Sequence, residues 1–280
     1  MNKEASKYLT RELKKLADNS EYSINQLRVQ VALERILARV VTNHKLTEKL
    51  IFKGGLVLAR VYGSSRYTRD IDALGKDADV SWLKDEVVNT LEKDIDDGFW
   101  FGNIQIEDLE HQGKYDGLRF DMAFQIGEPK VSKIHKLPRI HFDIGIGDSI
   151  GEVVPSLALI PLIKIGEPIS WKVYPPEFIY SEKLETLVSR GSESSRAKDY
   201  HDLCLLASEV EMNKLVDAIK VTFTNRATEI PNSFVDFLCS LDFSNILPSW
   251  KAQGLGDFET TLKSLKSKFA DIDKNMNLNE

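Results

Sequence analysis

Cysteine and histidine are scarce in this chain of 280 residues. The sequence contains two cysteines, Cys204 and Cys239, which lie among leucines, and five scattered histidines. A zinc site needs such ligands at short, regular spacings, and the sequence has none of these spacings. We therefore predict no zinc site, and we interpret both cysteines as small buried hydrophobic residues in a reducing compartment.

Long apolar runs and an excess of basic residues are also lacking. No run of about 18 apolar residues occurs, and the first residues form no apolar signal segment, so we expect a cytoplasmic protein without membrane contact. The formal net charge is −6, with 42% hydrophobic and 29% charged residues, as in ordinary globular proteins. This balance argues against a general nucleic-acid coat protein but leaves room for an enzyme that binds RNA through a local patch.

The stretch Ile51–Asp72 contains two features that phosphate chemistry needs. Gly54 and Gly55 stand between a short apolar strand and a predicted helix, where a phosphate can approach the backbone N–H groups. Asp70 and Asp72 end the stretch and, in an extended strand, leave the same face with Cα atoms about 6–7 Å apart. Two carboxylates at this separation can hold one or two Mg²⁺ ions.

Strand patterns dominate the next part of the chain. We predict strands over Trp100–Leu109, Leu118–Ile126, Arg139–Ile146 and Ile169–Tyr174. In the third of these, Phe142 and Ile144 point to one face while Asp143 and Gly145 point to the other. The residues alone leave two interpretations of Asp143 open: the polar face of an edge strand, or a carboxylate placed in a site where bulk is avoided.

Helical patterns flank these strands. Before and between the strands we predict helices over Ala5–Ala17, Asp79–Asp96 and from a Ser23 cap to Val41; after them we predict helices over Glu177–Ser189, Arg196–Ser208, Asn213–Thr224, Ser233–Leu241 and Phe258–Phe269. The sequence therefore predicts an α/β domain over residues 1–175 and a helical region over residues 176–280.

The helical region contains a second polar cluster, within residues 180–203. Lys183 lies opposite the apolar face of its predicted helix, and Asp199 and Asp202, three apart, share a face of the next helix. Lys183 and Arg196 together can neutralise a triphosphate, one as a mobile point charge and the other as a fork. The alternative is a salt bridge within a helix hairpin, for example between Lys183 and Asp199.

A basic run precedes the third strand. Residues 129–142 contain Lys130, Lys133, Lys136 and Arg139 and no acidic residue. A solvated loop is the first interpretation of this run, and a surface for RNA phosphates is the second.

Two runs of the sequence resemble one family. Gly54 and Gly55, followed by Gly63–Asp72, resemble the signature of the DNA-polymerase-β-like nucleotidyltransferases, and more narrowly that of the AbiEii/AbiGii toxins of abortive-infection and toxin–antitoxin systems. Residues 182–203 resemble the later motif of these toxins, E-K-L-x-x-L-x-x-R-x-x-x-x-x-R-x-K-D-x-x-D-L. The resemblance implies an α/β fold with a mixed sheet, flanking helices and a C-terminal helical region that contributes to the active site.

The resemblance also implies roles for individual residues. Asp70 and Asp72 hold Mg²⁺ or Mn²⁺, and a carboxylate from a later strand completes the metal site: Asp143, with Asp148 and Asp121 as alternatives. Lys183 contacts nucleotide phosphates, Asp199 is essential to activity, and Asp202 supports them. The full set expected to bind the nucleotide is Lys53, Gly54, Gly55, Ser64, Arg66, Thr68, Lys183, Arg196 and Lys198.

By the same resemblance, the chain is expected to be a toxin that transfers a nucleotide from an NTP to RNA, with tRNA as the acceptor, and to serve in phage defence. Its expected partner is a separate AbiEi-like antitoxin that need not touch it. Two other functions stay open: the same chemistry on a small molecule, as in antibiotic-adenylylating enzymes, and a GTP-binding module without catalysis. Loss of both Asp70 and Asp72 would abolish transfer but not simple nucleotide binding.

Overall fold

A computed structural model of the chain describes residues 1–110, 116–147, 150, 155–193 and 196–277. Contacts divide the chain into two compact units. The first, here called the α/β unit, consists of Met1–Val61, Tyr67–Gly147 and Val154–Val173. The second, the helical unit, consists of Tyr62–Arg66, Asp148–Val153 and Tyr174–Glu280. The short segment Tyr62–Arg66, which lies between Gly54-Gly55 and Asp70 in the sequence, is therefore grouped with the C-terminal helices.

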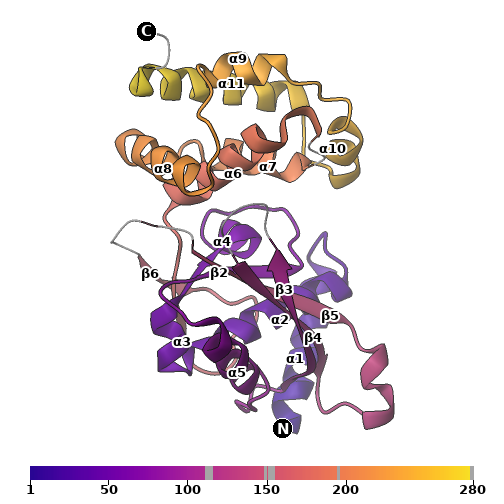
Figure 1. Cartoon of the computed structure of the whole chain (residues 1–280). Helices are drawn as coiled ribbons and strands as arrows, with labels where there is room; N and C mark the ends of the chain where they lie inside the picture. Colours follow the sequence, from indigo (N-terminus) through magenta and orange to yellow (C-terminus); the bar gives the residue numbers. More distant parts are fainter. Residues whose placement is uncertain (111–115, 148–149, 151–154, 194–195, 278–280) are drawn as a thin grey trace. The chain divides into compact units, whose positions relative to one another are not determined.

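The α/β unit contains both helices and strands (Figure 1). In chain order they are α1 (Lys3–Asp18), α2 (Ile24–Val41), α3 (His44–Lys49), β1 (Leu50–Lys53), α4 (Gly54–Arg60), β2 (Asp70–Gly75), α5 (Val80–Leu91), β3 (Phe99–Glu110), β4 (Asp116–Ile126), the 3₁₀ helix η1 (Val131–Lys136), β5 (Arg139–Ile146), β6 (Ser156–Leu159) and β7 (Ile169–Lys172). The helix cap predicted at Ser23 is confirmed: its hydroxyl accepts the backbone N–H of Gln26, and the Gln26 side chain completes a capping box.

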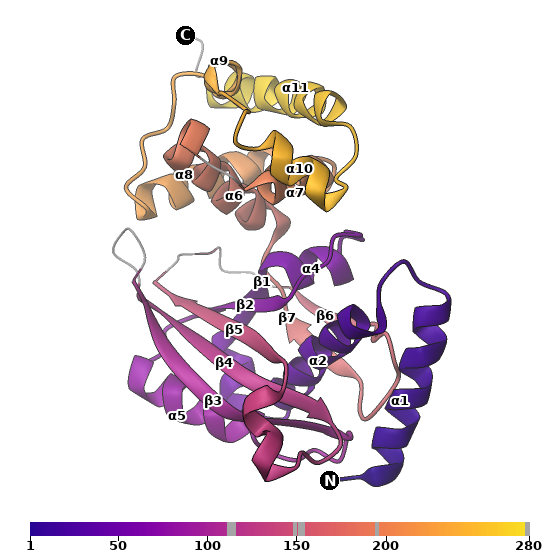
Figure 2. The ribbon, with the colours of Figure 1, turned by 90° about the vertical axis from the view of Figure 1, so that its right-hand side faces the viewer.

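Five strands form a mixed sheet in the order β1-β2-β5-β4-β3 (Figure 2). β2 and β5 are parallel, and the other neighbouring pairs are antiparallel. The predicted bounds of β5 are confirmed, but this strand lies at the centre of the sheet. The edge-strand interpretation of Asp143 is therefore wrong, because β5 has a hydrogen-bonded neighbour on each side. β6 and β7 form a separate two-stranded sheet.

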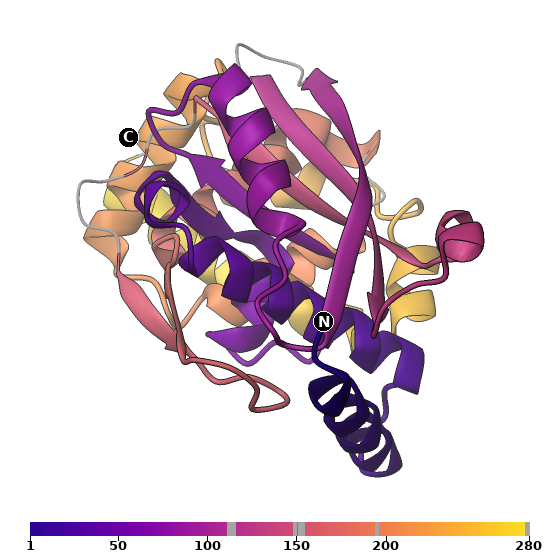
Figure 3. The ribbon, with the colours of Figure 1, turned by 90° about the horizontal axis from the view of Figure 1, so that it is seen from below.

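The two faces of the main sheet differ in character. One face carries fully buried apolar side chains from the central strands: Ile71, Ala73, Leu118, Phe120, Met122, Phe124, Ile140, Phe142 and Ile144. Helix α2 runs along this side (Figure 3), where the Arg39 guanidinium stacks over the Phe101 ring at 4.6 Å. The other face carries the charged residues of β2, β4 and β5, so the alternation in the sequence separates a core from a polar surface.

A buried ion pair joins α2 to the chain just before β3. Arg39 donates two hydrogen bonds to the Asp97 carboxylate, at 2.8 and 3.1 Å, and a third to the carbonyl of Phe99. This pair explains why α5 ends at Leu91 rather than continuing to Asp96 as predicted. The residues after Leu91 must turn to bring Asp97 to Arg39, because an unpaired buried guanidinium would be costly.

Glu34 of α2 is a second buried charge, and it makes stability depend on pH. It accepts a hydrogen bond from Arg60 at 2.8 Å and from the backbone N–H of Leu162. Burial nevertheless raises the pKa of Glu34 from 4.5 to about 6. Between these two values the folded chain keeps a proton that the unfolded chain has lost, so stability falls as the pH rises through this window.

We expect this single group to remove about 2 kcal/mol of unfolding free energy between pH 4.5 and 7. Glu34→Gln should remove that part of the pH dependence, because the amide does not titrate. Urea unfolding of both proteins at the two pH values measures the difference. If wild type and variant lost equal stability between the two pH values, Glu34 would not be the titrating group.

The helical unit contains α6 (Pro176–Arg190), the 3₁₀ helix η2 (Gly191–Glu193), α7 (Ala197–Leu206), α8 (Met212–Asn225), α9 (Phe234–Ser240), α10 (Leu247–Gln253) and α11 (Phe258–Met276). The predicted helices of this region are confirmed, and α10 was not predicted. Gly191, which has φ +49°, ends α6. The prediction that both cysteines are buried is wrong, because Cys204 is partly exposed and Cys239 is exposed.

Candidate functional site

Charged side chains from all strands of the main sheet form one row across its polar face. The strand register pairs Lys53 with Asp72, Asp72 with Asp143, Asp143 with Arg119, and Arg119 with Glu107. Residues paired in this way project from the same face of a sheet. The row therefore places two of the predicted metal-binding carboxylates, Asp72 and Asp143, side by side at the centre.

Asp70 lies two residues before Asp72 on β2, and thus on the same face, as predicted. Its side chain is exposed, and its Oδ1 atom accepts a hydrogen bond from the Thr68 hydroxyl at 2.6 Å. Thr68 is in turn fixed by Gln30 of α2, whose amide donates to the Thr68 carbonyl at 2.7 Å. Buried Thr68, predicted to bind nucleotide, is thus placed to orient the Asp70 carboxylate.

The Gly-Gly corner lies directly against the Asp72 side chain. Gly54 begins α4 with φ +74°, and a Cβ atom there would collide with the Asp72 carboxylate. A side chain at this position is therefore excluded both by backbone conformation and by space. The structure thus brings together Gly54 and Asp72, the two features that the sequence placed 18 positions apart.

Asp143 is held by an arginine that the sequence analysis did not single out. Arg119 of β4 donates from Nε to Oδ1 at 2.9 Å and from Nη2 to Oδ2 at 2.7 Å. This pair raises the pKa of Arg119, with smaller contributions from Glu107 and Asp70. Of the alternatives for the third carboxylate, Asp121 is paired with Arg139 at 2.7 Å, and Asp148 lies outside the described residues.

The carboxylates on this face are of the ligand type that a hard divalent cation prefers. They supply only oxygen ligands from neighbouring strands, as Mg²⁺ and Mn²⁺ prefer. Among the described residues, however, no group of three or more acidic, histidine or cysteine side chains is gathered closely enough to hold a metal ion. Both oxygens of Asp143 accept hydrogen bonds from Arg119.

A second charged cluster lies within the helical unit, centred on Lys183 of α6. The Lys183 ammonium lies 3.0 Å from the Asp199 carboxylate and 2.7 Å from that of Asp202. Burial alone lowers the pKa of Lys183, but the two carboxylates more than offset it and leave the pKa raised. The salt bridge between Lys183 and Asp199, which the sequence left open as the alternative, is therefore present, and it is largely buried.

Asp202 ties this cluster to the segment that follows α4. Arg66 donates from Nε and Nη2 to the two Asp202 oxygens, at 3.2 and 3.0 Å. Burial would raise the pKa of Asp202, but Lys183 and Arg66, together with His201, lower it well below its ordinary range. No local sequence pattern indicates this pairing, because 136 residues separate its members.

The remaining predicted nucleotide-binding residues lie partly in each unit. Ser64 is buried, and its hydroxyl accepts the backbone N–H of Arg66. Arg196 lies 3.0 Å from Asp199, while Lys198 is exposed on α7. Gly55 follows Gly54 in the first turn of α4.

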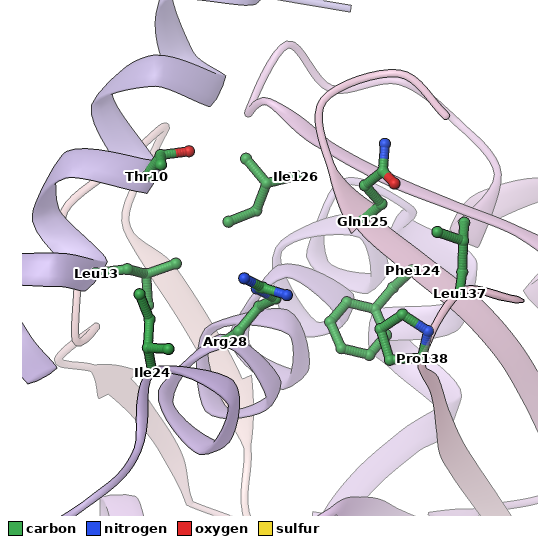
Figure 4. A pocket seen from close by; sticks show the side chains of 9 residues that line it. All are labelled: Thr10, Leu13, Ile24, Arg28, Phe124, Gln125, Ile126, Leu137 and Pro138. Carbon is green, nitrogen blue, oxygen red and sulfur yellow. The ribbon is translucent and has the colours of Figure 1, made fainter. Parts of the chain in front are cut away.

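A pocket of about 310 Å³ lies elsewhere in the α/β unit, between α1, the start of α2 and the end of β4 (Figure 4). Its lining residues are Thr10, Leu13, Ile24, Arg28, Phe124, Gln125, Ile126, Leu137 and Pro138. None of them belongs to the charged row or to the predicted site.

Comparisons with known proteins gave a family match and similar solved structures. The family model of the nucleotidyl transferase AbiEii toxin, of type IV toxin–antitoxin systems, matches residues 35–273. The crystal structure of JHP933 from Helicobacter pylori is similar with a TM-score of 0.56 and 18% identity, covering 92% of this chain and 94% of that chain. The crystal structure of a candidate nucleotidyltransferase from H. pylori is similar with a TM-score of 0.53 and 16% identity, covering 93% and 99%.

A search of curated proteins found no match. At such low identity, the two crystal structures show a shared fold, which confirms the predicted nucleotidyltransferase architecture with a mixed sheet and flanking helices. In the described part of the chain, no helix has the length and apolar character needed to cross a membrane.

Proposed function

Since this protein belongs to the AbiEii nucleotidyltransferase toxin family, whose model matches residues 35–273, we propose that it transfers a nucleotide from an NTP to an RNA acceptor with a divalent cation as cofactor. The observation that carries this proposal is the charged row on the sheet, where Asp72 lies beside Asp143 and against Gly54. Asp70 stands on the same face of β2.

Asp70, Asp72 and Asp143 would hold Mg²⁺ or Mn²⁺. When bound, the cation neutralises the triphosphate and stabilises the charge that develops on the transferred phosphoryl group. Gly54 leaves the backbone beside Asp72 clear of a side chain, so that a phosphate can approach there. Thr68 keeps the Asp70 carboxylate oriented.

In the proposed reaction, an acceptor hydroxyl oxygen attacks the α-phosphorus of the NTP and the bond to the β-phosphate oxygen breaks, which releases pyrophosphate. Asp143 takes the proton of the hydroxyl on a carboxylate oxygen. Lys183 and Arg66 offset the negative charge of the phosphates, and the carboxylates of Asp199 and Asp202 hold Lys183 in place.

The proposed acceptor is tRNA, and the proposed biological role is growth arrest opposed by an AbiEi-like antitoxin. An RNA acceptor is supported by the run around η1, where Lys130, Lys133 and Lys136 are exposed and no acidic residue lies among them. These lysines can attract phosphates without regard to sequence, although the chain as a whole is acidic.

The direct test incubates the purified protein with Mg²⁺, each α-³²P-labelled NTP in turn and total RNA. We expect label in RNA of tRNA size with one NTP, and no transfer in EDTA. Label in small molecules of a cell extract, with none in RNA, would establish the small-molecule alternative. Binding of GTP without transfer to any acceptor would establish a binding module.

A further inference from the structure

Arg119 is the register partner of Asp143 on β4. Its two hydrogen bonds, at 2.9 and 2.7 Å, engage both carboxylate oxygens. Glu107 flanks it on the neighbouring strand, and Asp70 is close enough to raise its pKa. Arg119 is thus surrounded by carboxylates, of which Asp70 and Asp143 are assigned to the cation in the proposed function.

We propose that Arg119 is a positioning residue that takes the place of the divalent cation at Asp143: its guanidinium neutralises the carboxylates of the row in the cation-free protein and must release Asp143 when the cation binds. The proposal rests on the proposed function, because it takes Asp143 as a cation ligand. It assigns a role to a residue that is part of neither family-like motif.

The register of the row places two like charges at its centre. Asp72 and Asp143 are register neighbours on adjacent parallel strands, and like charges at adjacent positions of a sheet repel each other. The Arg119 fork removes this repulsion at one end of the pair. A divalent cation would be repelled by the guanidinium and would need the same oxygens, so each weakens the binding of the other at Asp143.

The sheet contains a matched pair that serves as a control. Arg139 and Asp121 lie on the same two strands with the roles reversed, since the arginine comes from β5 and the carboxylate from β4. Their Nε–Oδ2 distance is 2.7 Å, and the Arg139 side chain is 27% exposed, close to the 35% of Arg119. Arg139 also donates to the backbone carbonyls of Asn103 and Asp121, and only Arg119 contacts a carboxylate assigned to the cation.

The experiment measures Mn²⁺ binding to the full chain by electron paramagnetic resonance, without nucleotide or RNA. The proteins are wild type, Arg119→Gln, Arg119→Lys and Arg139→Gln. We expect Arg119→Gln to lower the Kd for Mn²⁺ about fivefold, which corresponds to loss of one partly exposed ion pair. Arg119→Lys, which keeps the charge but not the fork, should lie between wild type and Arg119→Gln, and Arg139→Gln should stay within about twofold of wild type.

Thermal unfolding in EDTA provides the second readout. Both glutamine variants should unfold at a lower temperature than wild type, and added Mn²⁺ should raise the unfolding temperature of Arg119→Gln more than that of Arg139→Gln. Unchanged or weaker Mn²⁺ binding in Arg119→Gln would overturn the inference. Tighter binding in Arg139→Gln alone would overturn it too, because Asp121 would then be the ligand. If wild type bound no Mn²⁺ at a saturable site, the proposed function itself would fail.

Discussion

Asp70→Asn is expected to lower the rate of nucleotide transfer at least about a thousandfold, because it removes a charged ligand of the proposed cation. The amide has the same shape and can still accept the Thr68 hydroxyl hydrogen bond. The side chain is exposed, so the fold should be unaffected. Label transfer from NTP to RNA measures the rate, and induction of the variant in bacteria should no longer arrest growth.

The matched control is Asp77→Asn. Asp77 follows the same strand, and its φ of +49° is a conformation that asparagine tolerates well. This variant loses the same charge outside the proposed site, and it should keep wild-type transfer. If Asp70→Asn retained a tenth or more of the wild-type rate, or arrested growth as strongly at equal abundance, this carboxylate would not be a cation ligand in the reaction.

Lys183→Met is expected to abolish detectable transfer and to lower the free energy of unfolding by about 3–5 kcal/mol. The ammonium lies between Asp199 and Asp202, so its loss leaves two buried carboxylates with less positive charge around them. Urea unfolding measures the stability, and labelled transfer at a protein concentration where the variant is folded measures the activity.

A second variant separates the two effects. In Lys183→Met with Asp202→Asn, one negative charge is removed along with the positive one, while Asp199 keeps its ion pair with Arg196. We expect this double variant to regain at least half of the lost stability and to remain inactive, because the Lys183 ammonium proposed to face the phosphates is still missing. Recovery of transfer together with stability would show that Lys183 serves the fold alone.

Local patterns in the sequence predict most elements of this fold. The alternation in Arg139–Ile146 predicts β5 with its observed bounds, and Ser23 predicts the start of α2. Both depend on residues close together in the chain. The short helices α3 and α10, of six and seven residues, were missed, although α9, which also has seven residues, was predicted.

The order of strands and the pairing of charges are not local properties. That β5 is central depends on β4 and β2 pairing with it on either side, which no pattern within β5 indicates. The Arg119–Asp143 pair depends on the register between β4 and β5, because its two residues lie 24 positions apart in the sequence. The predicted closeness of Gly54 and Asp72 agrees with the structure, because both belong to one family-like motif and Gly54 directly follows β1, the antiparallel neighbour of β2.

The central claim is that Asp70 and Asp72 bind a divalent cation on the polar face of the sheet. Anomalous diffraction from crystals of the full chain grown with Mn²⁺ and a non-hydrolysable NTP tests it most directly. The account predicts an anomalous peak within coordination distance of carboxylate oxygens of both residues. A protein that transfers nucleotides with Mn²⁺, yet shows its bound Mn²⁺ away from these two carboxylates, would contradict it.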